Sequence, residues 1–352
     1  MSRHPLPCPM KLDSTPITLT GCAKTFRGTR VLEPLDLSIG AGETLVLLGP
    51  SGCGKTTTLR LIAGLDTPDA GGRILFGGDD VTRLPIERRQ VGMVFQNYAL
   101  FPNLTVRGNV SYGLKIRKTA PRALRERVDE LLAMMRLDAH TDKPVDQWAG
   151  GQRQRAALAR ALAVRPRVLL LDEPLTALDA KLRDVLRRDM NALLRELGVT
   201  TVYVTHDQAE AMELGDRIVV MGAGRIEQIG TPRDIYYRPA NRTVAQFIGT
   251  LNRLAGQWRD GALATTGGSI VTPHAADEWF FRPEAAQLAD PAQAPRPGAL
   301  GACAFLGGRT RLTIEPAAPD ALVIDVPGRI ELARGTAVGL TIAAEGLIAL
   351  AA

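Results

Sequence analysis

Residues 49–57, GPSGCGKTT, have the composition and spacing of a phosphate-binding loop. They follow the apolar run TLVLL (44–48) and precede TTLRLIAGL, so a strand, a tight loop and a helix are expected in that order. Glycines let backbone N–H groups surround an oxyanion, Lys55 adds a charge for the β- and γ-phosphates, and the Thr56 hydroxyl is a ligand for Mg²⁺. The residues expected to contact phosphate are Gly49, Pro50, Ser51, Gly52, Cys53, Gly54, Lys55, Thr56 and Thr57.

Two carboxylates end a second apolar run, VLLLDE at residues 168–173. Parallel α/β sheets place their chemistry at the carboxyl ends of the strands, so this position favours a functional pair. Asp172 is expected to bind Mg²⁺, directly or through water, and Glu173 to orient and deprotonate an attacking water. The alternative is a solvated acidic pair that caps a helix after Pro174.

Two more polar side chains follow apolar runs. His206 comes directly after TTVYVT (200–205), and Gln96 lies in MVFQNYALFP (93–102). A lone histidine at a strand end is more often structural than catalytic, but two other strands already bring phosphate chemistry to the same edge. An amide at Gln96 can contact both a metal and a water. We therefore expect both side chains beside the phosphate site.

The apolar pattern predicts the elements that position these residues. Up to about residue 240, β-branched or leucine-rich runs alternate with helical patterns, which is typical of an α/β fold with a parallel sheet. RIVVMGAGRIEQIG (217–230) predicts a hairpin that turns at 222–224. One helix is expected to bury Leu124, Val128, Leu131, Leu132 and Met135, and another Leu182, Val185, Leu186, Met190, Leu193 and Leu197.

The pattern of apolar residues changes after residue 240. The helical periodicity is lost, and short strand-like runs such as LTIE (312–315) and VGLTI (338–342) follow. We predict a nucleotide-binding domain at 15–240, with a helical subdomain at about 97–165, and a small β-rich domain at 241–352. The motifs of the first domain are not repeated, so the chain carries the parts of one nucleotide site.

Composition limits the classes of protein. The four cysteines are too few and too scattered for a disulfide framework, and no C-x-x-C pair indicates zinc. No apolar run has the length of a signal peptide core or a membrane-spanning helix, so neither is expected. A net charge of +6 over 352 residues is weak, and we expect no nucleic acid partner.

In this order, LGPSGCGKTT, FQ, GGQ, LLLDEP, ALDA and VTHD resemble the motifs of ABC transporter ATP-binding subunits, and the resemblance extends through nearly the whole chain. It implies a P-loop NTPase that hydrolyses ATP with Mg²⁺, the metal being held by Thr56, Gln96 and Asp172. The remaining roles that it implies are adenine stacking for Phe26, the Q-loop for Gln96, Walker B for Asp172, the catalytic base for Glu173, the D-loop for Asp179 and the γ-phosphate switch for His206.

QWAGGQRQR (147–155) resembles the family's signature motif, in which a glycine-rich turn begins a helix and directs N–H groups and the helix dipole at a γ-phosphate. That phosphate is bound by the partner subunit, which implies a head-to-tail homodimer around two ATP molecules. Trp148 and Ala149 replace the family's usual Leu-Ser, and the missing hydroxyl is expected to weaken hydrolysis without abolishing it. The contacting residues would be Ala149, Gly150, Gly151 and Gln152.

Two further segments narrow the resemblance to importers. NYALFPNLTVRGNVSYGL (97–114) is similar to the segment that receives the transmembrane permease subunit, with Tyr98, Phe101 and Leu104 as apolar contacts. FFRPEA (280–285) and the strands after it resemble the OB-like TOBE barrel, a regulatory module. The resemblance implies a peripheral protein on the cytoplasmic face of the inner membrane, with permease subunits and, indirectly, a solute-binding protein as partners.

None of these residues is expected to contact the transported solute, so they do not identify it. The resemblance of both domains favours importers of polyamine, 2-aminoethylphosphonate or ferric iron over sugar importers. A soluble regulatory ABC-type ATPase is the alternative, but such proteins usually carry two cassettes or long coiled-coil insertions. A small-molecule kinase with a phosphate loop would leave GGQRQR, Asp179 and His206 unexplained.

Overall fold

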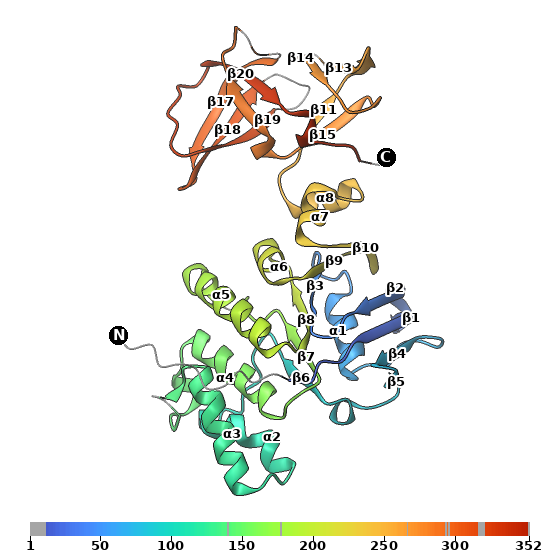
Figure 1. The fold of residues 1–352 in the computed structure, drawn as a ribbon, viewed down its shortest axis with the longest axis vertical. Coiled ribbons are helices and arrows are strands. Elements are labelled where there is room, and N and C mark those ends of the chain that lie inside the picture. Colours follow the sequence, from blue (N-terminus) through green and yellow to red (C-terminus); the bar gives the residue numbers. More distant parts are fainter. Residues whose placement is uncertain are drawn as a thin grey trace. The chain divides into compact units, whose positions relative to one another are not determined.

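The computed structural model describes residues 12–138, 141–176, 178–265, 267–292, 294, 296–315 and 321–350. The chain divides into two compact units between Pro232 and Arg233, a few residues before the limit expected from the sequence (Figure 1). Each unit has its own apolar core. Within the described part of the chain, no helix is long and apolar enough to span a membrane.

A six-stranded sheet forms the centre of the first unit, in the order β10-β9-β3-β8-β7-β6 (Figure 1). All neighbours are parallel except β10, which pairs antiparallel with β9 as the predicted hairpin. Every residue of β3 and β8 is buried, which explains their continuous apolar runs. The strands are β3 (Thr44–Leu48), β6 (Val91–Val94), β7 (Val168–Asp172), β8 (Thr200–Thr205), β9 (Arg217–Gly222) and β10 (Arg225–Gly230).

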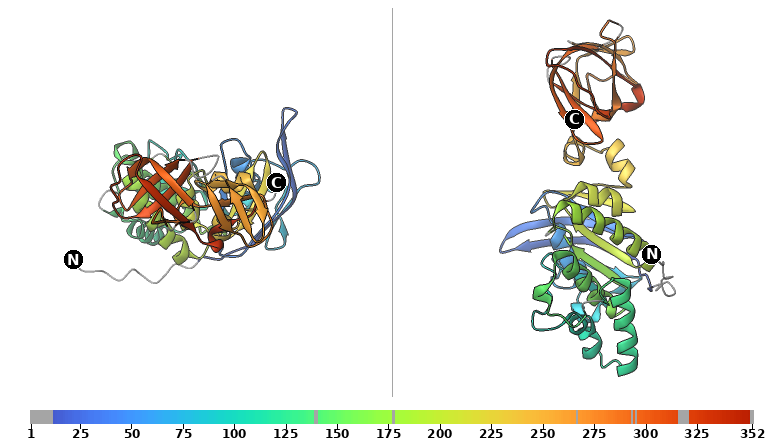
Figure 2. Two further views of the ribbon diagram at one scale, coloured as in Figure 1. Left: turned by 90° about the horizontal axis from the view of Figure 1, so that it is seen from above. Right: turned by 90° about the vertical axis from the view of Figure 1, so that its left-hand side faces the viewer.

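A second, antiparallel sheet of the first unit was not expected from the sequence. It has the order β2-β1-β4-β5, and its two long strands form a hairpin that projects in both views of Figure 2. The inward side chains of β1 and β2 join the core beneath the central sheet. The strands are β1 (Ile17–Phe26), β2 (Thr29–Ile39), β4 (Arg73–Phe76) and β5 (Asp79–Asp80).

Helices of the first unit fall into two groups. The green helices α2, α3 and α4 pack together in Figure 1, within the span expected for the helical subdomain, and α1, α5 and α6 accompany the central sheet. The helices are α1 (Lys55–Ala63), α2 (Val106–Ile116), α3 (Pro121–Met134), α4 (Gly150–Ala163), α5 (Ala180–Leu197) and α6 (Gln208–Leu214), with 3-10 turns at Ile86–Arg88 and Val145–Gln147.

The predicted buried face of α3 is confirmed, since Val128, Leu131, Leu132 and Met135 are buried and Leu124 is half-buried. On α5 the face is rotated from the prediction, because the buried residues are Leu186, Met190, Leu194 and Leu197. The expectation for Val185 was wrong: its side chain is 41% exposed, since it lies one residue, about 100°, away from the buried stripe. Leu193 is only half-buried and Leu194 takes the core position.

The second unit is β-rich, as predicted. Two helices, α7 (Pro232–Tyr237) and α8 (Arg242–Ile248), precede three small sheets that share one core containing Trp279 and Phe281. The strands are β11 (Asn252–Ala255), β12 (Gln257–Arg259), β13 (Ala262–Thr265), β14 (Gly268–Val271), β15 (Glu278–Phe281), β16 (Ala286–Ala289), β17 (Arg296–Phe305), β18 (Arg309–Glu315), β19 (Leu322–Pro327), β20 (Ala337–Ile342) and β21 (Leu347–Ile348), with 3-10 turns at Pro283–Ala285 and Ala344–Gly346.

The Arg-Pro-Glu motif after β15 has a structural role inside this unit. The buried guanidinium of Arg282 donates to the carbonyl oxygens of Ala245, Gly249 and Thr250, at 2.9, 3.1 and 3.2 Å. Its plane also lies 4.5 Å from the ring of Tyr236 on α7. The motif therefore fastens the two short helices to the β-strands.

Candidate functional site

The predicted phosphate loop leaves β3 and enters α1, with Gly54 as the N-cap of the helix. A Cβ at Gly49 would lie 2.4 Å from the carbonyl oxygen of Met221 and 2.6 Å from Sγ of Cys53, so only glycine fits at that position. The loop backbone is thus held close to β9. Cys53 is 3% exposed and belongs to the apolar core, and its backbone N–H donates to the carbonyl oxygen of Pro50 at 3.4 Å.

Lys55 holds the loop in its curled form. Its ammonium, 5% exposed, donates to the carbonyl oxygens of Gly49 and Pro50 at 2.7 and 2.8 Å. The loop and Glu173 border a cavity of about 250 Å³ that also reaches Val31 of β2. Backbone N–H groups, a helix N-terminus and a buried ammonium are the features expected of a site for phosphate groups. It is lined by Val31, Ser51, Gly52, Gly54, Lys55, Thr56, Thr57 and Glu173.

Thr56 and Asp172 meet across the site. The Thr56 hydroxyl donates to Oδ1 of Asp172 at 3.2 Å, which joins the start of α1 to the end of β7. Burial raises the pKa of Asp172, and the hydrogen bond from Thr56 partly opposes that rise. A bound cation at this position would stabilise the charged form of the carboxylate, which burial has removed from water.

The residues present fit Mg²⁺. Within the described residues no cluster of three histidine, cysteine, aspartate or glutamate side chains can form a metal cage. Mg²⁺ does not need such a cage, because it commonly takes one or two protein oxygens and completes its shell with phosphate and water. Thr56 and Asp172 supply two hard oxygens at the phosphate loop. Gln96, the third expected ligand, contacts Glu173 instead in this structure.

Glu173 is held by three neighbours. Its Oε2 accepts a hydrogen bond from Nε2 of Gln96 at 3.3 Å and from the hydroxyl of Thr176 at 3.2 Å, and Nδ1 of His206 lies 3.2 Å from the same oxygen. The residue also has a φ of 46°, a left-handed conformation that is uncommon outside glycine. A fixed carboxylate at a strained backbone position is typical of a functional site.

Three adjacent strands bring this group together. Gln96 follows β6, Asp172 ends β7 and His206 follows β8, while the phosphate loop follows β3 on the other side of β8. The carboxyl ends of parallel strands lie at one edge of a sheet, so the sequence prediction of a shared edge is confirmed. Thr176 was missed, because a threonine inside a turn carries no distinct sequence signal.

The signature segment starts α4 as expected. Ala149 is the N-cap and offers no side-chain acceptor to the first turn, while Oε1 of Gln152 accepts the N–H of Ala149 at 3.2 Å. Because the two glycines have no side chains, Leu178 of the D-loop and Leu186 of α5 pack close to the start of α4. A Cβ at Gly150 would lie 2.7 Å from Cδ2 of Leu178, and one at Gly151 would lie 3.1 Å from Cδ1 of Leu186. A side chain at either glycine would therefore have to displace a leucine side chain of the D-loop side.

Ala149→Ser is expected to raise both stability and turnover. The serine hydroxyl would complete a capping box with Gln152, worth roughly 0.5–2 kcal/mol. A hydroxyl donating to a phosphate oxygen would add roughly ten- to a hundredfold in ATP affinity or hydrolysis rate. Thermal unfolding and steady-state ATP hydrolysis measure the two effects, with Ala149→Cys as the control for side-chain size. Turnover and affinity equal to those of the wild type would show that the hydroxyl is unimportant in this chain.

Asp179 caps the helix after the D-loop. Its carboxylate accepts the N–H of Leu182 at 3.0 Å at the start of α5. Arg183, one turn into the helix, donates to the carbonyl oxygen of Leu178 at 3.0 Å and lies 3.5 Å from the carboxylate of Asp207. The guanidinium thus links the D-loop to the residue beside His206. Neither Arg183 nor Asp207 was predicted, because only the fold brings them together.

Glu210 forms a buried network under the histidine segment. Its Oε2 accepts the hydroxyls of Tyr203 and Thr205, both at 2.8 Å, and Thr205 in turn accepts the N–H of Asp207 at 2.9 Å. Glu210 is 1% exposed, and burial raises its pKa although the two hydroxyls lower it in part. The network fixes the backbone that carries His206.

Glu210→Gln is expected to gain stability relative to the wild type as pH rises. A carboxyl whose pKa is raised by folding contributes its stability below the unfolded-state pKa of about 4.3, and this contribution is lost as pH rises through the folded-state pKa. The amide keeps an acceptor for Tyr203 and Thr205 but never ionises. Thermal midpoints from pH 4 to pH 8 should diverge, with Glu126→Gln, an exposed site on α3, as control. Parallel curves would contradict the raised pKa of Glu210.

Phe26 lies at the end of β1, and its ring is 40% exposed. The ammonium of Lys24 lies 5.2 Å from the ring centroid. Adenine stacking by Phe26 remains a proposal, supported by an exposed aromatic face at the end of a strand.

The three predicted permease contacts differ in exposure. Phe101 is 37% exposed, and its ring centroid lies 4.3 Å from that of Tyr112 on α2; Leu104 is half-buried. Tyr98 is 6% exposed, so the expectation that its side chain makes an apolar contact with a partner is corrected. Its backbone has a φ of 62°, in the left-handed region, and burial raises the pKa of its hydroxyl.

The fold and the site define an ATPase of the phosphate-loop class. A family model described as ABC transporter matches residues 32–176, and one described as TOBE domain matches residues 281–350. The sulfate/thiosulfate import ATP-binding protein of Chromobacterium violaceum is 48% identical over 318 residues, 88% of this chain and 86% of that protein. The spermidine/putrescine import ATP-binding protein of Shigella boydii is 54% identical over 236 residues, 67% of this chain and 62% of that protein.

A solved dimeric ATP-binding cassette, in a post-hydrolysis state with ADP and Pi, is 33% identical with a TM-score of 0.55, covering 62% of this chain and 99% of that one. This chain belongs to the ATP-binding subunits of ABC importers that carry a C-terminal TOBE domain. It is therefore an ATP-binding ATPase.

Proposed function

We propose that this chain energises solute import by binding and hydrolysing ATP as a head-to-tail homodimer attached to permease subunits. The observation that carries the proposal is the single oxygen of Glu173, which is held by Gln96, Thr176 and His206 next to the phosphate loop. Such an arrangement serves an attacking water beside a γ-phosphate. No comparable arrangement is needed in a protein that only binds nucleotide.

In the proposed hydrolysis, Glu173 accepts the proton of the attacking water. Gln96 and Thr176 keep the carboxylate oriented, and His206 donates toward the developing negative charge. Lys55 and the loop N–H groups hold the phosphates. Mg²⁺, held by Thr56 and Asp172, would neutralise phosphate charge when bound.

The proposed dimer places the signature of one chain at the ATP of the other. The uncapped first turn of α4 at Ala149 and the exposed phosphate loop support this, because each offers N–H donors that a phosphate on the opposite surface can accept. Asp179 and Arg183 then lie at the start of α5, next to the signature. The relative solved as a dimer with ADP and Pi also supports this arrangement.

We propose that the permease docks on exposed apolar side chains of the helical subdomain. Phe101 and Tyr112 stack on each other, and Ile116 is 65% exposed one turn further along α2. Charge is supplied by Arg160, whose guanidinium lies 5.5 Å from the Phe101 ring. This attachment would keep the protein at the cytoplasmic face of the inner membrane.

Tyr112→Ala is therefore expected to keep the ATP hydrolysis of the isolated protein within about twofold while reducing transport by tenfold or more, as for an aromatic hot spot. Uptake in cells and hydrolysis by the purified variant are the two measurements. Tyr237→Ala, at a more exposed tyrosine of the second unit, is the control. Normal uptake by the Tyr112 variant would place the permease elsewhere.

The solute we propose is a polyamine, supported by the spermidine/putrescine import ATP-binding protein among the relatives. The sulfate/thiosulfate relative shows that similar cassettes serve solutes of opposite charge. 2-Aminoethylphosphonate and ferric iron, expected alongside, have no support among these relatives.

Deleting the gene in its native host tests both levels of the proposal. Uptake of labelled spermidine should fall, and the wild-type gene but not the Glu173→Gln variant should restore it. Loss of sulfate uptake instead would correct the solute and keep the importer. If no uptake is lost while the purified protein hydrolyses ATP, the importer role is contradicted and a soluble regulatory ATPase is favoured.

A further inference from the structure

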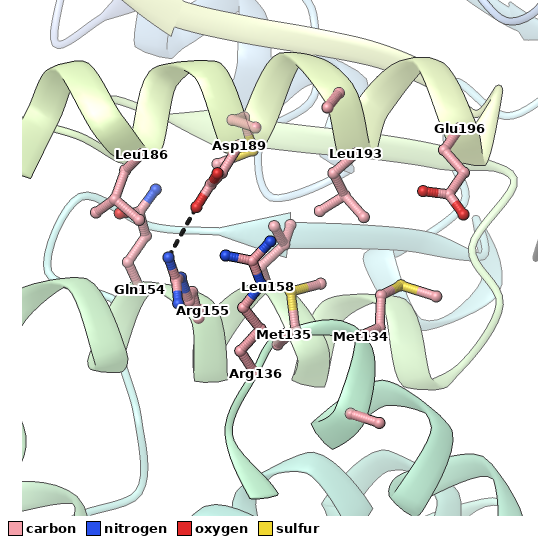
Figure 3. Close-up of a pocket in the computed structure, with 13 residues that line it drawn as sticks. Met134, Met135, Arg136, Gln154, Arg155, Leu158, Leu186, Asp189, Leu193 and Glu196 are labelled. Atoms are coloured by element: carbon pink, nitrogen blue, oxygen red, sulfur yellow. Dashed lines mark hydrogen bonds and ion pairs between the residues drawn. The ribbon is translucent and has the colours of Figure 1, made fainter. Parts of the chain in front are cut away.

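A second cavity of the first unit shares no lining residue with the phosphate site. It measures about 190 Å³, is partly open to solvent, and is bordered by the end of α3 and by facing sides of α4 and α5. Figure 3 shows Leu186, Asp189, Leu193 and Glu196 along one side of α5, opposite Gln154, Arg155 and Leu158 of α4 and Met134 to Arg136. No residue assigned to ATP chemistry lines it.

The walls are apolar and adaptable. Three methionines line the cavity together with three leucines: Met134, Met135, Met190, Leu158, Leu186 and Leu193. Methionine is flexible and polarisable, and its sulfur makes favourable contacts with aromatic rings. An apolar cavity of 150 Å³ holds a benzene ring, so one about a quarter larger has room for a small fused ring system.

One polar side chain of the cavity wall, Gln154, has a buried atom without a partner in the described ranges of the chain. Gln154 is 2% exposed, and its Oε1 has no hydrogen-bond partner among the residues that the structure describes. A buried amide oxygen without a donor is costly, and a ligand that supplies an N–H or O–H removes the cost. A molecule bound in this cavity is therefore expected to carry an N–H or O–H group that donates to Gln154.

The charges at the cavity cancel. Arg155 and Asp189 pair across α4 and α5 at 2.8 Å, and the exposed Arg136 and Glu196 are one cation and one anion. With two charges of each sign, the site favours neither an anionic nor a cationic ligand. An uncharged ligand follows from this balance.

We propose that this cavity binds a small, uncharged aromatic molecule with one hydrogen-bond donor, of about the size of indole. The donor bonds to Oε1 of Gln154, and the ring lies among the methionine and leucine side chains. Leu186 belongs both to the cavity wall and to the surface under the signature, where its Cδ1 lies 3.1 Å from the Cβ position of Gly151. Ligand binding therefore stiffens the contact between the signature helix and α5.

Calorimetric titration of the full chain with indole, and with indene as the same shape without the N–H, tests the proposal. Indole is expected to bind saturably with one site and about tenfold more tightly than indene, the gain for satisfying a buried acceptor. Gln154→Leu should remove that difference, and Gln287→Leu, an exposed glutamine of the second unit, should preserve it. Leu193→Trp, which adds the volume of a fused ring to a wall residue, should abolish binding of both compounds.

Three outcomes would overturn the assignment: no saturable binding of indole, equal affinity for indole and indene in the wild type, or unchanged binding in Leu193→Trp. Thermal unfolding of each variant without ligand confirms that it is folded, and Gln154→Leu is expected to fold because a buried unpaired amide is replaced by an apolar group of similar size. None of these readouts depends on ATP hydrolysis or on import.

Discussion

Glu173→Gln is expected to bind ATP with unchanged affinity and to hydrolyse it about 10²- to 10⁴-fold more slowly. The amide has the shape of the carboxylate, and its oxygen can still accept the hydroxyl of Thr176, now 3.2 Å away. It cannot accept the proton of water. The loop contacts of Lys55 are untouched, so binding and chemistry should separate.

Blocked hydrolysis should also trap the proposed dimer. Light scattering of Glu173→Gln should show an ATP-dependent change from monomer to dimer in the presence of Mg²⁺, whereas Glu126→Gln, at an exposed site on α3, should behave as the wild type. Turnover near the wild-type rate would remove Glu173 from the role of base. A monomeric mass with ATP bound would contradict closure in the isolated protein.

The features that the sequence predicted are those encoded by contiguous residues. The phosphate loop, the acidic end of β7 and the start of α4 each need only a strand or helix and the next few side chains. Their common location also followed from sequence, because parallel strands place their carboxyl ends together. The resemblance supplied the role of Asp179, whose carboxylate otherwise reads as a helix cap.

Contacts between distant segments were not predictable in the same way. Arg183 reaches both Leu178 and Asp207, and Glu210 collects two hydroxyls from β8, only after α5 and α6 pack beside the sheet. The burial of Tyr98 was not predicted either, because an aromatic residue in an apolar loop can face the core or a partner until the fold is known. Bulges interrupt the pairing of β1 with β2, so their polar and apolar residues do not alternate regularly, and the sequence did not predict these strands.

The glycine pair of the signature has two roles, a contact with phosphate and close packing against α5, and the sequence predicted only the first. Its N–H groups and helix terminus suit a phosphate of the partner, while its lack of side chains lets Leu178, Leu182 and Leu186 approach. The signature therefore lies directly on the helix that begins with Asp179. We therefore expect a movement of the first turns of α5 to reach the proposed γ-phosphate contact through these leucines.

Lys55→Met is expected to lower ATP affinity by roughly ten- to a hundredfold for each phosphate contact that is lost. Methionine has a similar length but no charge, and it leaves the carbonyl oxygens of Gly49 and Pro50 without their donor. Hydrolysis and import should fall with the affinity.

Fluorescence titration with a labelled ATP measures this loss, and Lys115→Met, which removes the same charge from an exposed position on α2, is the matched control. Because Lys55 also fastens the loop, a thermal unfolding curve must accompany the titration. A folded Lys55→Met variant whose Kd for ATP lies within twofold of the wild type would mean that backbone donors alone hold the phosphates. In that case the buried ammonium would serve only the curled shape of residues 49–54.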